Sequence, residues 1–162
     1  MRKIIISFVV LAAIIGIFGV SAFAAPDVLN PDAVGNTKAL VTVTNPEGNS
    51  DMTFENSYVI SGYGEIGTVV TVYFFNPETG LYEKFYKTVT TVGEDGVTAT
   101  EKQSVSSTIG ESTLFFNTIN LDFGSNSYML YAEKGEQVQI GKFFIIKNNY
   151  NVIDVIRSWG AY

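Results

Sequence analysis

Residues 57–72 read SYVISGYGEIGTVVTV, two apolar runs on either side of a short turn rich in glycine. We expect Gly62 to end the first strand. The turn from Gly64 to Gly67 tolerates the positive φ angles that other residues avoid. The Thr/Val run that follows has the composition of a strand. The stretch therefore predicts two consecutive strands, the second of which crosses to an opposing sheet.

The same kind of alternation extends from Lys38 to Lys147. Runs rich in Val, Ile, Thr, Tyr and Phe are separated by turn signals such as NPEG at 45–48. Within a run, a period of two places apolar residues on one face of a sheet. The sets that share a parity are Ala39, Val41 and Val43; Val70, Val72 and Phe74; Phe115, Ile119, Leu121 and Phe123; and Val138, Ile140, Phe144 and Ile146. Seven to nine short strands with no long helix between them predict an all-β domain, an antiparallel β-sandwich over 38–147.

Two parts of this domain have their own signatures. Val69–Phe75 and Phe143–Ile146 are apolar at both parities, so we expect central strands with both faces at least partly covered. The stretch 88–113 is dense in Ser, Thr and Gly. It predicts an exposed hairpin, with strands over 87–92 and 97–105 around an Asp-Gly turn.

Residues 57–72 also resemble the signature of bacterial immunoglobulin-like domains, in which an apolar-Ser-Gly step precedes a glycine-containing turn and a Thr/Val strand. Residues 127–135, SYMLYAEKG, resemble the hairpin that closes such domains, and 138–147 resemble their terminal strand. The resemblance covers 38–147 and implies an immunoglobulin-like sandwich.

The N-terminal residues 1–24 have the three parts of a cleavable secretory signal peptide. A positive start and an apolar run over 4–20 precede small residues of the kind that a signal peptidase reads. No second run of that length follows, so we expect a mature protein that does not span the membrane and is secreted or held at the cell surface. Residues 25–37, small and polar, are expected to form an extended lead-in.

The C-terminal residues 148–162 are expected to form a tail that packs on the domain or extends it. Val152, Val155, Ile156 and Trp159 recur at helical spacing, which favours a short helix or an irregular tail. The same residues also suit the extension of a final strand.

Composition excludes several functions. The formal net charge is −6, and it becomes −8 on loss of 1–24, which carries two positive and no acidic residues. Such a surface repels nucleic acid and anionic membranes. The chain has no histidine and no cysteine, so it lacks disulfides, the residues of Ser-His-Asp and Cys-His catalysis, and ordinary zinc ligands. We expect neither an enzyme nor a nucleic-acid-binding protein, and no cofactor.

Aromatic residues are the main candidates for binding. Tyr82 and Tyr86 share a parity near the predicted hairpin, and amphipathic rings suit contacts with sugars or proteins. Aromatic residues also fill sandwich cores, which is the alternative interpretation. Trp159 is a third candidate, as the anchor of the C-terminal tail.

Calcium is the one inorganic partner that the composition allows, because oxygen ligands suffice for it. Asn49, Asp51 and Glu55 lie close together in one predicted loop. The chain has no spaced acidic calcium loop, so exposed loop residues are the alternative interpretation.

These observations predict an exported, non-catalytic immunoglobulin-like module of a bacterium. Its expected role is adhesion, assembly or scaffolding through contacts with a protein or another cell-envelope component, and it is open to forming oligomers. One alternative is a carbohydrate-binding domain with an exposed tyrosine face. Another is a fibre subunit whose terminal segment adds a strand to a neighbour's sheet.

Overall fold

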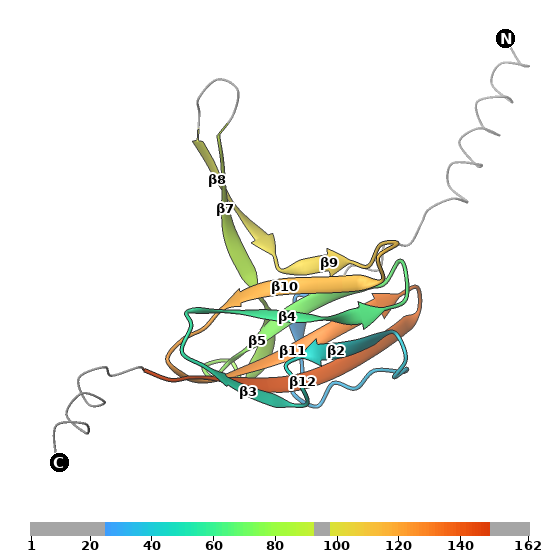
Figure 1. Cartoon of the computed structure of the whole chain (residues 1–162), viewed down its shortest axis with the longest axis horizontal. Coiled ribbons are helices and arrows are strands. Elements are labelled where there is room, and N and C mark those ends of the chain that lie inside the picture. The colour runs from blue at the N-terminus through green and yellow to red at the C-terminus, as the bar shows by residue number, and fades with distance from the viewer. Residues whose placement is uncertain (1–24, 93–97, 150–162) are drawn as a thin grey trace, which may run out of the picture.

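The computed structural model describes residues 25–92 and 98–149, which form strands and no helix (Figure 1). Nothing in this part of the chain is a helix long and apolar enough to cross a membrane. The strands are β1 (Val28–Leu29), β2 (Val41–Asn45), β3 (Ser50–Thr53), β4 (Ser57–Gly64), β5 (Val69–Asn76), β6 (Leu81–Lys84), β7 (Tyr86–Val92), β8 (Thr98–Ser104), β9 (Ser106–Thr108), β10 (Leu114–Asn120), β11 (Gly124–Lys134) and β12 (Gln137–Lys147). The described residues thus hold more strands than the seven to nine predicted, because β1, β3 and β9 are too short to display an alternation.

Two regions of the sequence prediction lie outside the described residues. They are the signal peptide over 1–24 and, from 150 onward, the C-terminal tail with its short helix.

Two sheets pack face to face, which confirms the predicted all-β architecture of a sandwich (Figure 1). The larger sheet has the order β1-β6-β5-β11-β12-β3, and β9 pairs with the first residues of β5. The smaller sheet has the order β10-β4-β2. Neighbouring strands are antiparallel except β12 and β3, which are parallel. The chain crosses between the sheets at the predicted glycine turn, where Gly67 has a φ of 86°.

The main core lies between the two sheets. Ile60 and Ile119 of the smaller sheet and Val72, Leu130 and Ile145 of the larger sheet are all fully buried there. Their parity in the sequence selects this face, as alternation requires. The burial of these apolar side chains is the main stabilising contribution to the fold.

Strand β4 does not end at Gly62, as the sequence predicts, but continues to Gly64. A Cβ atom at Gly62 would lie 2.1 Å from the Thr42 carbonyl oxygen and 2.8 Å from the ring of Phe115. The backbone of Thr42 and the ring of Phe115 thus leave no room for a side chain at position 62. A glycine that provides this space can lie inside a continuous strand.

A second apolar cluster lies on the outer face of the larger sheet. Residues 25–37, predicted as a lead-in, cover this face: Ala25 and Leu29 are buried against Tyr73 and Met129. Strand β1, within this segment, pairs with β6. The small side chains that made the segment look like a linker allow it to lie close to the sheet.

The two runs that are apolar at both parities differ in the structure. In β5 both faces are covered, as predicted. In β12, Phe143 and Ile145 are buried, but Phe144 and Ile146 are exposed on the outer face. The outer face of this end of the strand is thus only partly covered, which agrees with the prediction that both faces are at least partly covered.

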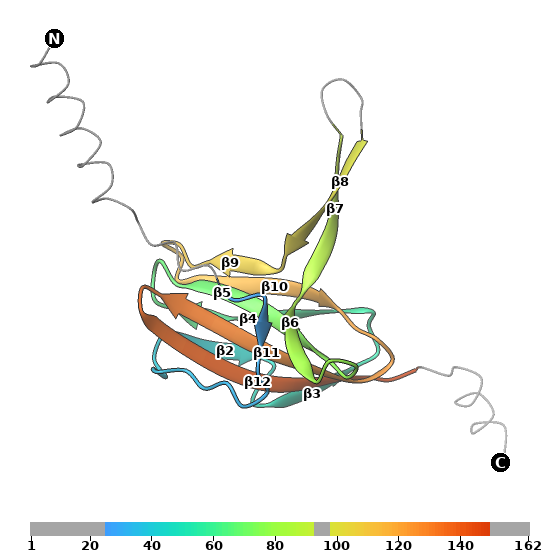
Figure 2. The same cartoon turned by 180° about the vertical axis from the view of Figure 1, so that it is seen from behind.

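Strands β7 and β8 form an arm that rises away from the sandwich (Figures 1 and 2). They pair in register from Tyr86 opposite Ser104 to Val92 opposite Thr98, which confirms the predicted exposed hairpin. At the base of the arm, the Val105 N–H donates a hydrogen bond to the Phe85 carbonyl at 2.7 Å.

Candidate functional site

The outer face of the smaller sheet carries four large apolar side chains that are open to solvent. Their exposed fractions are 43% for Val59, 51% for Tyr63, 60% for Leu114 and 72% for Phe116. We call this face the platform. Its residues are Thr42, Thr44, Ser57, Val59, Ser61, Tyr63, Leu114, Phe116, Thr118 and Asn120. None of these ten residues is charged.

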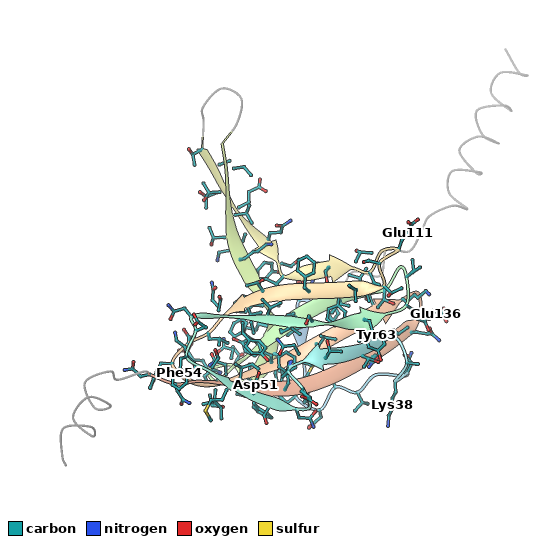
Figure 3. All side chains as sticks on the ribbon, in the orientation of Figure 1. Lys38, Asp51, Phe54, Tyr63, Glu111 and Glu136 are labelled. Carbon is teal, nitrogen blue, oxygen red and sulfur yellow. The ribbon has the colours of Figure 1, made fainter. Side chains whose placement is uncertain are left out.

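The strand register brings the platform residues together. Leu114 lies opposite Tyr63, and Phe116 lies opposite Ser61. Side chains that face each other across antiparallel strands lie about 5 Å apart at Cβ, close enough to form one continuous surface. Figure 3 shows Tyr63 on this sheet, toward the end of β4. Two aromatic rings and two aliphatic side chains therefore share a surface with hydroxyl groups.

The sandwich core supports the platform from below. Phe115 and Ile119, which alternate with the exposed residues of β10, are buried in the main core. Between them, Asn117 is also buried, and its side-chain amide donates to the Val70 carbonyl of the opposite sheet at 3.4 Å. The platform is thus the outer face of a packed sheet, and the backbone that carries its side chains is fixed by the core.

A shallow hollow of about 300 Å³ lies within the platform. It is lined by Thr44, Ser61, Gly62, Tyr63, Leu114, Phe115 and Phe116. Gly62 contributes no side chain here. The hollow can receive an apolar side chain of a partner, with hydroxyl groups beside it.

Tyr82 and Tyr86, the tyrosines singled out in the sequence, do not share an exposed face. Tyr82 is buried on the outer face of the larger sheet, where its ring packs on Phe75 and its hydroxyl lies 2.7 Å from the Ser127 Oγ. Tyr86 is exposed at the base of the arm. The strand is interrupted at Phe85, between β6 and β7. Because the two tyrosines lie on different strands, their shared parity does not place them on the same face.

Tyr86 borders a groove of about 630 Å³ between the arm and the larger sheet. Thr88 and Lys102 of the arm line the same groove. Lys84 lies there too, but its ammonium group is 3.1 Å from the Asp27 carboxylate. The groove is therefore a mixed polar surface, in contrast to the uncharged platform.

The predicted calcium residues form a different arrangement. The Asp51 carboxylate accepts hydrogen bonds from the Tyr58 hydroxyl at 2.6 Å and from the Met52 N–H at 2.7 Å, which lower the pKa of Asp51. Asn49 uses its backbone carbonyl to accept from the Phe144 N–H, and Glu55 is exposed. Across residues 25–92 and 98–149, no three acidic side chains gather in a way that could hold a metal ion.

Trp159, the third predicted binding residue, lies outside the described residues. The platform residues Tyr63, Leu114 and Phe116 did not stand out in the sequence as binding residues. One signal for them exists: Leu114-Phe115-Phe116 is apolar at both parities, and β10 lies at the edge of its sheet. In a two-layer sandwich each strand turns one face to the opposite sheet, so a run that is apolar at both parities exposes one apolar set unless another segment covers it.

Comparison of the chain with protein-family models, with curated proteins and with solved structures finds no match.

Proposed function

We propose that the chain is an exported, non-catalytic immunoglobulin-like module that binds a protein partner through the platform, in adhesion, assembly or scaffolding at the bacterial cell surface. Its strand order supports the immunoglobulin-like class. Strands β10, β4 and β2 oppose β5, β11 and β12, as strands E, B and A oppose C, F and G in immunoglobulin domains. The signal peptide over 1–24 supports export.

The observation that carries the proposal is the uncharged platform with its four exposed apolar side chains. Contiguous patches of exposed apolar side chains often mark contact sites. Aromatic residues such as Tyr63 and Phe116 are enriched in interfaces, while charged residues are depleted from interface cores. In a chain of net charge −6, a charge-free face is also where another acidic protein meets the least repulsion.

The composition of the platform favours a protein over a sugar chain. Sugars stack on aromatic rings and bind to polar groups, and Tyr63 suits such contacts. Leu114 and Val59, however, add branched aliphatic surface next to the rings. Such surface complements the apolar side chains of another protein.

The test uses a charge on the platform and a matched charge elsewhere. Leu114→Glu places a carboxylate on the platform, and Ile66→Glu places one on the turn after β4, at a side chain of similar size and exposure. Both positions are open to solvent, so both variants should fold with stabilities within about 0.5 kcal/mol of the unchanged protein. We expect Leu114→Glu alone to abolish binding to the partner.

The partner is identified by a photo-crosslinking amino acid at position 116, with position 66 as the control, in the producing bacterium. A protein adduct at 116 that is absent at 66 and lost on Leu114→Glu supports the proposal. A glycan adduct at 116 would favour the carbohydrate-binding alternative. Equal labelling from both positions would mean that the platform binds nothing specific.

A further inference from the structure

Ala25, the first described residue, is held inside the fold. It is buried in the outer cluster of the larger sheet with Leu29, Tyr73 and Met129. The two residues that follow are also fixed. The Tyr73 hydroxyl donates to the Pro26 carbonyl, and the Lys84 N–H donates to the Asp27 carbonyl at 3.0 Å. The backbone nitrogen of Ala25 therefore has a defined position in the structure.

That nitrogen faces a buried acid. Its N–H lies close enough to the carboxylate of Glu133 on β11 to lower the pKa of that acid, and Glu133 is only 8% exposed. Burial raises the pKa of Glu133, while the Ala25 N–H and the nearby charge of Lys84 act in the opposite direction. Within the described part of the chain, Lys84 forms its ion pair with Asp27, and the other ion pair joins Lys134 to Glu65.

A buried carboxylate is costly unless a cation compensates for its charge. Tyr73 and Tyr131 lie close to Glu133 and supply no positive charge, and the nearby Lys84 is paired with Asp27. One amide N–H is a weak partner for such a group. The fold therefore presents a buried acid beside a backbone nitrogen, at the position where the sequence predicts the signal peptide to be cut.

We propose that cleavage between Ala24 and Ala25 creates the missing cation, an α-ammonium group on Ala25 that forms a buried ion pair with Glu133 and fastens residues 25–37 to the larger sheet. This inference rests on the proposed export of the chain. In the reaction, a signal peptidase uses one water molecule to hydrolyse the peptide bond. The Ala24 carbonyl becomes a carboxylate, and the released Ala25 amine takes up a proton.

The pair has a defined pH signature. An α-amino group titrates at about pH 8 when free, and a neighbouring carboxylate raises the pKa of the amine in the folded state. Where Glu133 is ionised, the stabilisation is complete below about pH 8 and is lost as the pH rises through the folded-state pKa of the amine. Lys84, Asp27, Tyr73 and Tyr131 also face this site. They are common to all forms compared below, so their contributions cancel in the differences.

The experiment compares two forms of the mature chain 25–162, one with a free amine and one acetylated at Ala25. Acetylation keeps the N–H donor and removes only the charge. We expect acetylation to increase the unfolding equilibrium constant in urea by at least about tenfold at neutral pH, given what removal of one partner costs in a buried pair. The difference should shrink at alkaline pH. In Glu133→Gln it should nearly vanish, whereas in Glu136→Gln, an exposed acid near the same strand end, it should persist.

Equal stability of the two forms at all pH values would overturn the inference. If Glu133→Gln does not fold, the pH dependence of the difference in the unchanged chain decides the matter. N-terminal sequencing of the protein exported by the producing bacterium tests the cleavage separately. A mature chain that starts elsewhere would refute cleavage at Ala25 while leaving the measured ion pair intact, so the two failures are distinguishable.

Discussion

Gln139 of β12 joins the two sheets with its side-chain amide. The amide nitrogen donates to the Val41 carbonyl at 2.9 Å, and the amide oxygen accepts from the Val41 N–H at 2.8 Å. One side chain thus satisfies both backbone groups of a residue in β2, at the edge of the smaller sheet. The free edge of a sheet can pair with a strand of another chain. At Val41, the Gln139 amide already binds the backbone groups that such a strand would use.

We predict that Gln139→Leu destabilises the protein by about 1–3 kcal/mol, since it leaves the two polar groups of buried Val41 without their partners. Urea unfolding measures the effect. Gln137→Leu, at an exposed position on the same strand, should change the stability by less than about 0.5 kcal/mol. An equal loss in both variants would refute the role of the amide.

The environment of Asp51 predicts that the stability of the fold depends on pH in the acidic range. Hydrogen bonds from Tyr58 and Met52 lower its pKa in the folded state, below the unfolded value of about 3.9. The carboxylate therefore stabilises the fold above that value, and this contribution is lost as the pH falls through the lower, folded-state pKa. We expect Asp51→Asn to be less stable than the unchanged protein at neutral pH, with a gap that narrows in acid.

Urea unfolding at a series of pH values measures this gap. In a Tyr58→Phe background the donor is absent, and the narrowing should be smaller. A gap of constant size from neutral to acidic pH would contradict the assignment.

At the scale of single elements, alternation predicts which side chains share a face, but it does not predict what covers that face. It correctly predicted the two covered faces of β5 and the exposed arm. It did not predict how far Phe144 and Ile146 are exposed, because coverage there depends on where residues 25–37 lie. It failed for Tyr82 because the strand is interrupted at Phe85. The platform was missed because the tertiary fold decides whether another segment covers the outer face of a sheet.

The arm is expected to be dispensable for folding. A two-stranded hairpin is at best marginally stable alone, and the described side chains of β8 are largely exposed. We predict that replacing residues 87–103 by Asn-Gly, which joins Tyr86 to Ser104 across a tight turn, changes the stability by less than about 1 kcal/mol. Urea unfolding checks this. A loss of cooperative unfolding would show instead that the arm supports the sandwich.

At the scale of the whole molecule, two groups of exposed apolar side chains lie on different sheets. One is the platform. The other is the end of the larger sheet, where Met52, Phe144 and Ile146 are exposed on β3 and β12. The chain leaves the described part beside this second surface, where the Asn148 N–H donates to the Thr53 carbonyl at 2.9 Å. The sequence prediction that 148–162 packs on the domain is testable there.

Trp159 is the only tryptophan of the chain, so its fluorescence reports on the tail alone. If the tail packs on this surface, the emission of the mature protein should be blue-shifted and independent of protein concentration. It should shift to the red in Ile146→Glu and stay unchanged in Leu114→Glu. A blue shift that appears only at high concentration would indicate strand addition between copies. The emission of a solvated indole would refute packing altogether.

The arm divides the sequence into two halves, and each sheet contains strands from both. Strands β1 to β7 precede residues 93–97 and strands β8 to β12 follow them, yet both sheets draw strands from each half. The smaller sheet needs β10 from the second half beside β4 from the first, and β11 of the second half pairs with β5 of the first. A single protease cut between Val92 and Thr98 would therefore yield two fragments that stay together until they are denatured. Expressed separately, these halves form a split protein whose reassembly reports the encounter of whatever is fused to them.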